Sequence, residues 1–294
     1  MNESVVSFEK QVELPDDVFR LLRDMLYEQS GVFLEDNSKL FVENRLQQSM
    51  HRRQFDNFRD YYYFLKYDRK KDEELSTFVD LLTIHETYFF REEKQLKAFT
   101  QEILPELLKQ KHRERSLRIW SAGCSTGEEP YTIAMLILEQ RAMMGWDVEI
   151  FGSDISQRVL QSARRGVYQQ TAFRSTEPRY IDTYFHKEGN AYRIDDRVKK
   201  SVTFLGLSIL DVSKLALINM MDVIFCRNVI IYFDPASKKK AVGIFHKKLK
   251  DHGYLLLGHS ESLINISTAF ALRHLQHDLV YQKFGGAESE EFKA

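Results

Sequence analysis

The chain has 294 residues, of which 43% are hydrophobic and 29% charged, a globular composition sufficient for one large domain and a small one. Its formal net charge of −1 gives no global electrostatic attraction to nucleic acid or to an anionic membrane. Two distant cysteines exclude a disulfide framework, and the N-terminus lacks the pattern of a signal peptide, so we expect a cytoplasmic protein without membrane insertion.

From the N-terminus to about residue 90, apolar residues recur at helical spacing with no convincing strand. The pattern predicts helices around residues 18–26, 40–46, 58–65 and 75–82. Residues 1–90 are therefore expected to form a helical domain.

The segment HETYFFRE (85–92) bridges this helical part and the rest of the chain. His85 and Glu86 match the start of a zinc-binding HExxH motif, but Phe89 stands where the second histidine ligand is needed. We therefore expect no metal.

Residues 117–137 run from an apolar strand through a glycine-containing turn into an apolar helix, as at the ligand-binding crossover of a doubly wound sheet. Gly123 lets the backbone approach a ligand, although its spacing to Gly127 does not match the GxGxxG fingerprint. Glu128 and Glu129 suit the helix dipole but would repel a pyrophosphate. A cationic, phosphate-free adenosine ligand fits better, and S-adenosylmethionine is the candidate.

Beyond residue 90, strands and helices alternate, which predicts a mainly parallel sheet with helices on both faces. One of these helices is expected over residues 235–253. A polar turn at Gly189 and Asn190 separates two alternating runs and predicts a small antiparallel subdomain at about 180–204. Residues 270–284 are expected to form two strands that close one edge. The predicted α/β domain covers 91–285, and 286–294 are expected to be disordered.

Polar residues follow two of the predicted strands at their carboxyl ends. Asp154 ends the strand VEIFGSD, where a carboxylate can accept hydrogen bonds from both ribose hydroxyls; as an alternative, it caps the helix that begins near Ser156. Arg227 and Asn228 follow a buried apolar run and are site candidates for the same reason.

Five motifs occur in order along the chain: HETYFFRE (85–92), WSAGCSTGEEPYTIAM (120–135), FGSDIS (151–156), DVIFCRNVIIYF (222–233) and GYLLLGHSES (253–262). Together they resemble the chemotaxis receptor methyltransferases, the CheR family. The resemblance implies a class I S-adenosylmethionine-dependent methyltransferase fold, a Rossmann-like α/β sheet with a helical N-terminal domain and a small antiparallel β subdomain. It also implies methyl transfer to glutamates on the cytoplasmic helices of chemoreceptors, with S-adenosylhomocysteine as the product.

The resemblance further implies a set of cofactor-binding residues: His85, Thr87, Arg91, Glu129, Asp154, Ser208, Ile209, Arg227 and Asn228. Arg91 and Tyr232 are the implied catalytic residues. The chain departs from the family at His85, where Asn is usual, and at Ser208, where Asn or Asp is usual. Three alternatives stay open: Glu129 as a residue that only complements the helix dipole, Arg91 as a surface residue and Tyr232 as core.

Arg45, Arg52 and Arg53 lie on or beside one predicted helix, and the resemblance implies that they dock the receptor helices. The alternative is a solvated basic face. The turn HKEGN is shorter than in members that hold a receptor's C-terminal peptide, so we expect no tether binding. Two other functions stay open: a methyltransferase of the same fold with a different substrate, and a non-catalytic cofactor-binding module.

Overall fold

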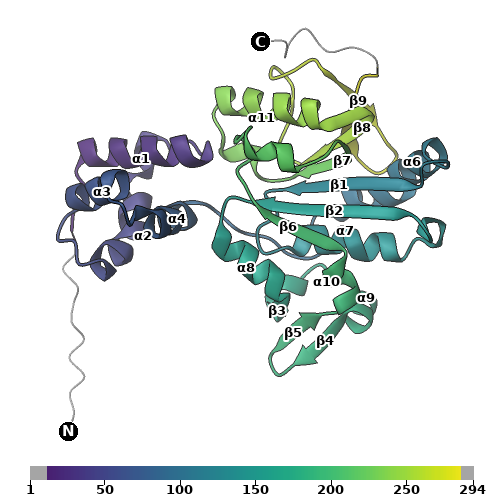
Figure 1. The fold of residues 1–294 in the computed structure, drawn as a ribbon, viewed down its shortest axis with the longest axis horizontal. Coiled ribbons are helices and arrows are strands. Elements are labelled where there is room, and N and C mark those ends of the chain that lie inside the picture. The colour runs from purple at the N-terminus through teal and green to yellow at the C-terminus, as the bar shows by residue number, and fades with distance from the viewer. Residues whose placement is uncertain (1–11, 286–294) are drawn as a thin grey trace. The chain divides into compact units, whose positions relative to one another are not determined.

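The computed structural model describes residues 12–285, so the predicted disorder of 286–294 lies outside the described residues. Its contacts divide the chain into two compact units, and the boundary in the sequence lies between Ile84 and His85. Figure 1 labels most of the helices and strands of both units. Each unit is described by itself below. No helix in the described part of the chain is long and apolar enough to cross a membrane.

The N-terminal unit is helical, and the four predicted helices are confirmed. Its elements are α1 (Asp16–Ser30), η1 (Asp36–Ser38), α2 (Lys39–Arg52), α3 (Phe58–Tyr67) and α4 (Lys71–Leu82). Gly31 ends α1 with a left-handed φ of 76°, and the Asn57 side chain caps α3 by accepting from the Asp60 N–H. Each helix buries one apolar stripe, and Leu22, Leu46 and Phe78 are among the fully buried side chains.

The Glu74 carboxylate is buried in the interior of this unit. Glu74, on α4, is 2% exposed and accepts hydrogen bonds from Ser49 Oγ at 2.6 Å, Tyr61 Oη at 2.7 Å and Arg53 Nε at 2.6 Å. Burial would raise the pKa of the Glu74 carboxyl, but these three donors outweigh it and hold the pKa below its usual value. The network joins α2, α3 and α4 through a single charged group.

The C-terminal unit is an α/β fold, which confirms the predicted alternation. Its helices are α5 (Glu93–Ala98), the π-helix η2 (Phe99–Ile103), α6 (Leu104–Gln110), α7 (Glu128–Leu138), η3 (Arg141–Met143), α8 (Gln157–Arg165), η4 (Gln170–Phe173), α9 (Pro178–Tyr184), α10 (Asp196–Lys200), η5 (Lys214–Leu217), η6 (Ile230–Tyr232) and α11 (Pro235–Lys248). Its strands are β1 (Ser116–Ala122), β2 (Asp147–Asp154), β3 (Val167–Gln169), β4 (Phe185–Glu188), β5 (Ala191–Ile194), β6 (Val202–Gly206), β7 (Met221–Cys226), β8 (Leu249–Leu257), β9 (Phe270–His274) and β10 (Leu279–Lys283).

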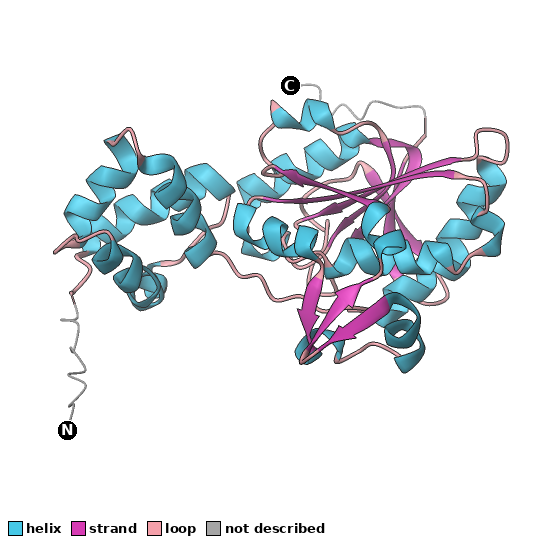
Figure 2. Cartoon of the chain, turned by 60° about the horizontal axis from the view of Figure 1, so that its bottom comes forward, coloured by secondary structure: helices cyan, strands magenta, loops and turns pink. Residues whose placement is uncertain are grey.

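Seven strands form the main sheet in the order β6-β2-β1-β7-β8-β10-β9. The first five strands in this order are parallel to one another. Strand β10 runs antiparallel to both β8 and β9, which confirms the two strands predicted at this edge. Helix α7 packs on β1 and β2, α8 on β2 and β6, and α11 on β8. Figure 2 shows helices on both faces of the sheet. The chain order reverses at β1, so the carboxyl ends of β1, β2 and β7 form the topological switch point.

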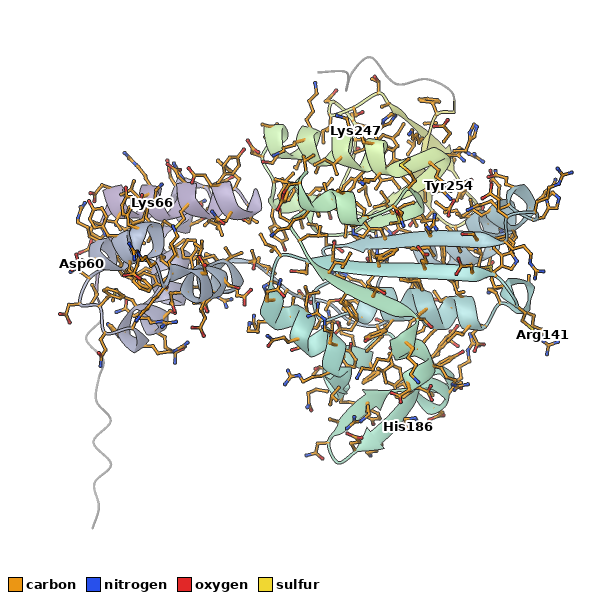
Figure 3. The ribbon with its side chains drawn as sticks, in the orientation of Figure 1. Asp60, Lys66, Arg141, His186, Lys247 and Tyr254 are labelled. Carbon is orange, nitrogen blue, oxygen red and sulfur yellow. The ribbon has the colours of Figure 1, made fainter. Side chains whose placement is uncertain are left out.

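A second, three-stranded antiparallel sheet in the order β3-β5-β4 interrupts the alternation between β2 and β6. The hairpin of β4 and β5 confirms the predicted turn, where Gly189 has a φ of 60°. Figure 3 labels His186 on β4, one of the exposed residues of this subdomain. An aromatic cluster packs beneath it, with Phe89 stacked on Phe173 at 5.2 Å and edge-on to Phe185 at 5.0 Å. Phe89 of the 85–92 segment is therefore core.

The helix expected over 235–253 ends earlier, and that part of the prediction is wrong. Helix α11 stops at Lys248, and β8 begins at Leu249 because this residue pairs with Met221 of β7. The register then shifts, and His252 takes a left-handed φ of 63° before the strand continues. Strand pairing thus overrides the helical pattern of the lysines in this segment.

Candidate functional site

The loop between β1 and α7 lies at the switch point of the sheet. Gly123 has a φ of 78°, and a Cβ there would collide with Val229, so both its conformation and its surroundings require glycine. The N–H groups of Gly123 and Cys124 donate to the Ser153 carbonyl at 2.8 and 2.9 Å. Gly127, with a φ of 93°, then starts α7. The turn is therefore bonded to the end of β2.

Asp154 lies at the carboxyl end of β2 and is 8% exposed. Its carboxylate accepts from the Ser125 N–H at 2.9 Å and from the Ser156 N–H at 2.9 Å. Ser156, not Asp154, caps α8, because its hydroxyl accepts from the Val159 N–H. Asp154 therefore joins the glycine turn to the start of α8.

Glu129 and Arg227 form a buried ion pair. Arg227 Nε donates to Glu129 Oε2 at 2.6 Å, and the side chains are 3% and 12% exposed. Ser121 Oγ donates to the other carboxylate oxygen at 2.6 Å. Arg227 Nη1 also donates to the Arg91 carbonyl at 2.9 Å and lies 3.6 Å from Glu92. One guanidinium therefore connects β7, α7 and the 85–92 segment.

Asn228 follows Arg227 and takes a left-handed φ of 59°. Its Oδ1 atom is buried without a hydrogen-bond partner in the described part of the chain. An unpaired buried acceptor is unfavourable, so this oxygen can accept a hydrogen bond from a ligand's donor.

The sequence offered Glu261 only as part of the motif 253–262, and its role was missed. The Glu261 carboxylate accepts four backbone N–H groups at 2.7–3.1 Å: those of Asn228, Val229, Ile231 and Gly258. Burial raises the pKa of this carboxyl although the four donors act in the opposite direction. Glu261 thus fixes the loop after β7 to the end of β8. The signal that could have found it is a lone carboxylate directly after a buried strand.

The 85–92 segment approaches the same place. The His85 carbonyl accepts from Ser125 Oγ at 3.0 Å, so His85 lies beside the glycine turn, while the half-buried Thr87 lies within the segment. Arg91 Nη1 donates to the Glu86 carbonyl at 3.0 Å. Burial raises the pKa of Tyr232, and the positive charge of Arg91 acts in the opposite direction. Tyr232 is half-buried rather than core.

Ser208 and Ile209 follow β6 next to Asp154. Gly206 pairs with Asp154, and the Leu207 N–H donates to the Asp154 carbonyl at 3.1 Å. Ser208 Oγ accepts from the Leu210 N–H at 3.2 Å, and Ile209 is buried. The turn after β6 therefore borders the site.

The three arginines of the N-terminal unit have different surroundings. Arg45 and Arg52 are exposed, and the Arg45 guanidinium lies 5.5 Å from the centre of the Phe41 ring. Arg53 is bound to buried Glu74 by its Nε and lies 3.5 Å from Glu73. Arg53 is also exposed, and its guanidinium joins the network of buried Glu74 from the surface of its own unit.

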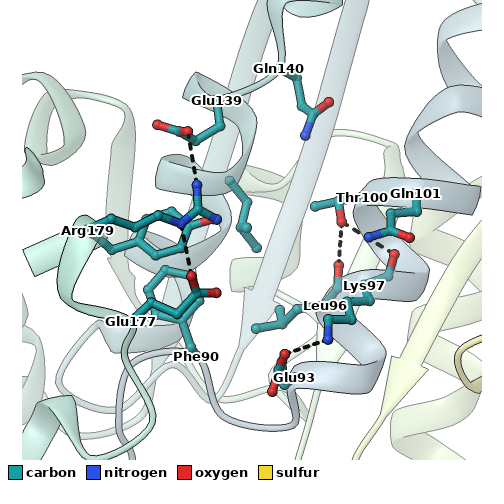
Figure 4. Close-up of a pocket in the computed structure, with 12 residues that line it drawn as sticks. Phe90, Glu93, Leu96, Lys97, Thr100, Gln101, Glu139, Gln140, Glu177 and Arg179 are labelled. Atoms are coloured by element: carbon teal, nitrogen blue, oxygen red, sulfur yellow. Dashed lines mark hydrogen bonds and ion pairs between the residues drawn. The ribbon is translucent and has the colours of Figure 1, made fainter.

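A cavity of about 280 Å³ lies at the far end of α7, between that helix, the π-helix and α9. Figure 4 shows that its charged side chains are paired among themselves. Lys97 binds Glu93 at 2.6 Å, and Arg179 binds Glu177 at 3.0 Å and lies 3.7 Å from Glu139. The cavity is separate from the glycine turn, and each of its two cations is paired with a carboxylate of the lining.

The residues at the switch point fit an adenosine ligand that carries a positive charge. Asp154 and Glu129 supply anionic acceptors for hydroxyl and ammonium groups, and the unpaired Oδ1 of Asn228 awaits a donor. Within residues 12–285, no cluster of three or more His, Cys, Asp or Glu side chains is arranged to hold a metal ion. A Rossmann-like sheet with carboxylates at its first crossover is the arrangement expected of an S-adenosylmethionine-dependent methyltransferase.

Comparisons with known proteins agree with this class. The model for the SAM-binding domain of CheR methyltransferases matches residues 85–279, and the model for their all-alpha domain matches 17–83. The chain is 35% identical to chemotaxis protein methyltransferase 2 of Vibrio cholerae, over 96% of this chain and 98% of that one. It is 34% identical to the chemotaxis protein methyltransferase of Borreliella burgdorferi, over 90% and 94% of the two chains. The chain belongs to the CheR methyltransferase family.

Proposed function

We propose that this enzyme transfers a methyl group from S-adenosylmethionine to glutamate side chains in the cytoplasmic helices of chemoreceptors. The products are glutamate methyl esters and S-adenosylhomocysteine, and the reaction takes place in the cytoplasm. The observation that carries the proposal is the full-length similarity to the Vibrio cholerae enzyme, named as a chemotaxis protein methyltransferase.

The cofactor residues follow from their chemistry. Asp154 binds the ribose hydroxyls, and Glu129 pairs with the ammonium of the methionine moiety. Gly123 has no side chain, so the ligand can lie close to the backbone there. The unpaired Oδ1 of Asn228 accepts a hydrogen bond from the cofactor. The remaining cofactor-binding residues are His85, Thr87, Arg91, Ser208, Ile209 and Arg227.

The chemistry requires no general base. A glutamate side chain has a reference pKa of about 4.3, so it is already ionised near neutral pH. The bound cofactor supplies a methyl group on a positively charged sulfur. The protein's task is to orient the carboxylate and to exclude water. The Arg91 guanidinium pairs with the substrate carboxylate, and Tyr232, with its raised pKa, presents a neutral hydroxyl beside it.

Receptor docking is assigned to the basic residues of α2. Arg45 and Arg52 are exposed cations that can contact an acidic helix. Arg53 adds a third positive charge while it stays paired with Glu74. The short turn of the β4–β5 hairpin supports the proposal that this enzyme does not bind a receptor tether.

Incubation with radiolabelled S-adenosylmethionine and receptor cytoplasmic fragments tests this function. We expect base-labile label in the fragment, because methyl esters hydrolyse in base. Base-stable label, or transfer only to a small molecule or nucleic acid, would indicate another substrate. Binding of S-adenosylhomocysteine without any transfer would indicate a non-catalytic module.

A further inference from the structure

Two guanidinium groups flank the ring of Tyr88 in the 85–92 segment. The Arg174 Cζ lies 3.8 Å from the centre of the ring, and the Arg91 Cζ lies 5.6 Å from it. Arg174 comes from the turn after η4, far from Arg91 in sequence. Stacking on an aromatic ring restricts a guanidinium and holds its N–H donors in one plane.

One residue, Glu86, contacts both cations, through its carboxylate and through its backbone carbonyl. Arg174 Nη2 binds Glu86 Oε1 at 2.6 Å, and Arg91 Nη1 donates to the Glu86 carbonyl at 3.0 Å. The Arg174 and Glu86 side chains are 47% and 65% exposed. An exposed ion pair adds little net stability, because both charges are well solvated and screened by salt. Another carboxylate can therefore replace Glu86 on Arg174 at small cost.

This cluster lies beside the proposed transfer site. The Arg91 carbonyl accepts from Arg227, which pairs with Glu129. The charges of Arg91 and Glu86 both act on Tyr232. Of the three charged side chains that meet at Tyr88, two are cations and one is an anion. Among the described residues, the Arg91 guanidinium bonds only a backbone carbonyl, so it has no carboxylate partner next to the place where the proposal puts the substrate carboxylate.

We propose that Arg174 is a substrate-specificity residue that pairs with a second carboxylate of the substrate, next to the glutamate that accepts the methyl group. Glu86 holds Arg174 in place until the substrate displaces it. Tyr88 keeps the guanidinium oriented for a two-pronged contact. The inference rests on the proposed function, because it requires an acidic protein segment as substrate.

Initial methylation rates at varied concentrations of a receptor cytoplasmic fragment test the proposal. We expect Arg174→Glu to raise the KM for the fragment about tenfold, the effect of one lost charge pair. Arg174→Lys keeps the charge and recovers most of this loss. Glu86→Gln removes the competing carboxylate and lowers the KM. Affinity for S-adenosylhomocysteine, measured by calorimetry, stays unchanged in all three variants.

Arg118→Ala is the matched control, since Arg118 binds Glu149 at 2.8 Å on strands β1 and β2 and is partly exposed. Its KM is expected to equal that of the wild type. Fragments in which single acidic residues beside the accepting glutamate are replaced by lysine are expected to restore the KM of Arg174→Glu. An unchanged KM in Arg174→Glu, or the same change in Arg118→Ala, overturns the inference alone. No transfer by the wild type overturns the proposed function and the inference with it.

Discussion

Arg227 donates from Nε to the Glu129 carboxylate at 2.6 Å and joins two segments 98 residues apart in the chain. Both side chains are almost fully buried, so the pair is insulated from solvent and screened little by salt. The same guanidinium holds the Arg91 carbonyl. The ion pair therefore sets the relative positions of the proposed cofactor and substrate residues.

Removing the charge of Glu129 tests this coupling. We expect Glu129→Gln to lower the free energy of unfolding by about 3 kcal/mol, because buried Arg227 loses its counter-charge. Affinity for S-adenosylhomocysteine is expected to fall at least about tenfold. Urea denaturation and calorimetry measure the two effects. Glu139→Gln, at the exposed end of α7, serves as the control and should leave cofactor affinity unchanged. Wild-type stability in Glu129→Gln would contradict the account.

Glu261 is expected to act through the loop that carries Asn228. Glu261→Gln keeps one acceptor oxygen but places an amide against backbone N–H groups, so the left-handed Asn228 loses its support. We expect a fall of about tenfold in affinity for S-adenosylhomocysteine, with partial recovery in Glu261→Asp. Asp234→Asn changes the N-cap of α11 and is the matched control. If Glu261→Gln and Asp234→Asn lower cofactor affinity equally, Glu261 has no specific positioning role.

Glu128 makes stability depend on pH. Burial raises the pKa of its carboxyl to about 7, although the Thr126 hydroxyl donates to it and opposes the shift. The folded state thus binds this proton more tightly than the unfolded chain, where the pKa is about 4.3. The contribution of the Glu128 carboxyl to the free energy of unfolding is fully present below pH ~4.3. It is lost as the pH rises to about 7, and it stays lost at higher pH.

Glu128→Gln removes the free-energy cost of burying an ionised carboxylate at this position. We expect the free energy of unfolding to rise by on the order of 3 kcal/mol at pH 8 and to change far less at pH 5. Urea unfolding at the two pH values measures the difference. An equal change at both would show that the Glu128 carboxyl does not titrate in this range.

The two neighbouring arginines of α2 are expected to behave differently. Arg53→Glu places a second carboxylate against buried Glu74, so we expect a loss of about 3 kcal/mol in unfolding free energy. Arg52 is exposed, and Arg52→Glu is expected to change stability by less than about 0.5 kcal/mol while impairing receptor methylation. Both variants keep their cofactor affinity. Normal receptor turnover by Arg52→Glu would remove the docking assignment for this residue.

The sequence predicted those parts of the molecule that depend on local pattern. Helical spacing located α1 to α4, and alternation located the main sheet and the β4–β5 hairpin. The site residues at strand ends were predictable because parallel strands bring their carboxyl ends to one edge. Gly123 and Asp154 are of this kind. The Gly123 N–H donates to the Ser153 carbonyl near the end of β2, and the Asp154 carboxylate accepts from the Ser125 N–H in the glycine turn.

Partnerships between distant residues could not be predicted. Nothing in the helical pattern of α2 indicates that Arg53 binds Glu74 on α4 while Arg52 stays exposed. The start of β8 at Leu249 depends on a pairing with Met221, which a helical run of lysines conceals. The four bonds of Glu261 require two loops to meet in space. These features arise from tertiary packing, not from local propensity.

We propose that S-adenosylmethionine binds at the carboxyl ends of β1, β2 and β7. Calorimetric titration of S-adenosylhomocysteine into the wild type and Asp154→Ala tests it most directly. We predict clear binding by the wild type and none measurable in the variant, because the ribose loses its anionic acceptor and the glycine turn loses its link to the start of α8. Equal affinity in the two proteins would contradict the account.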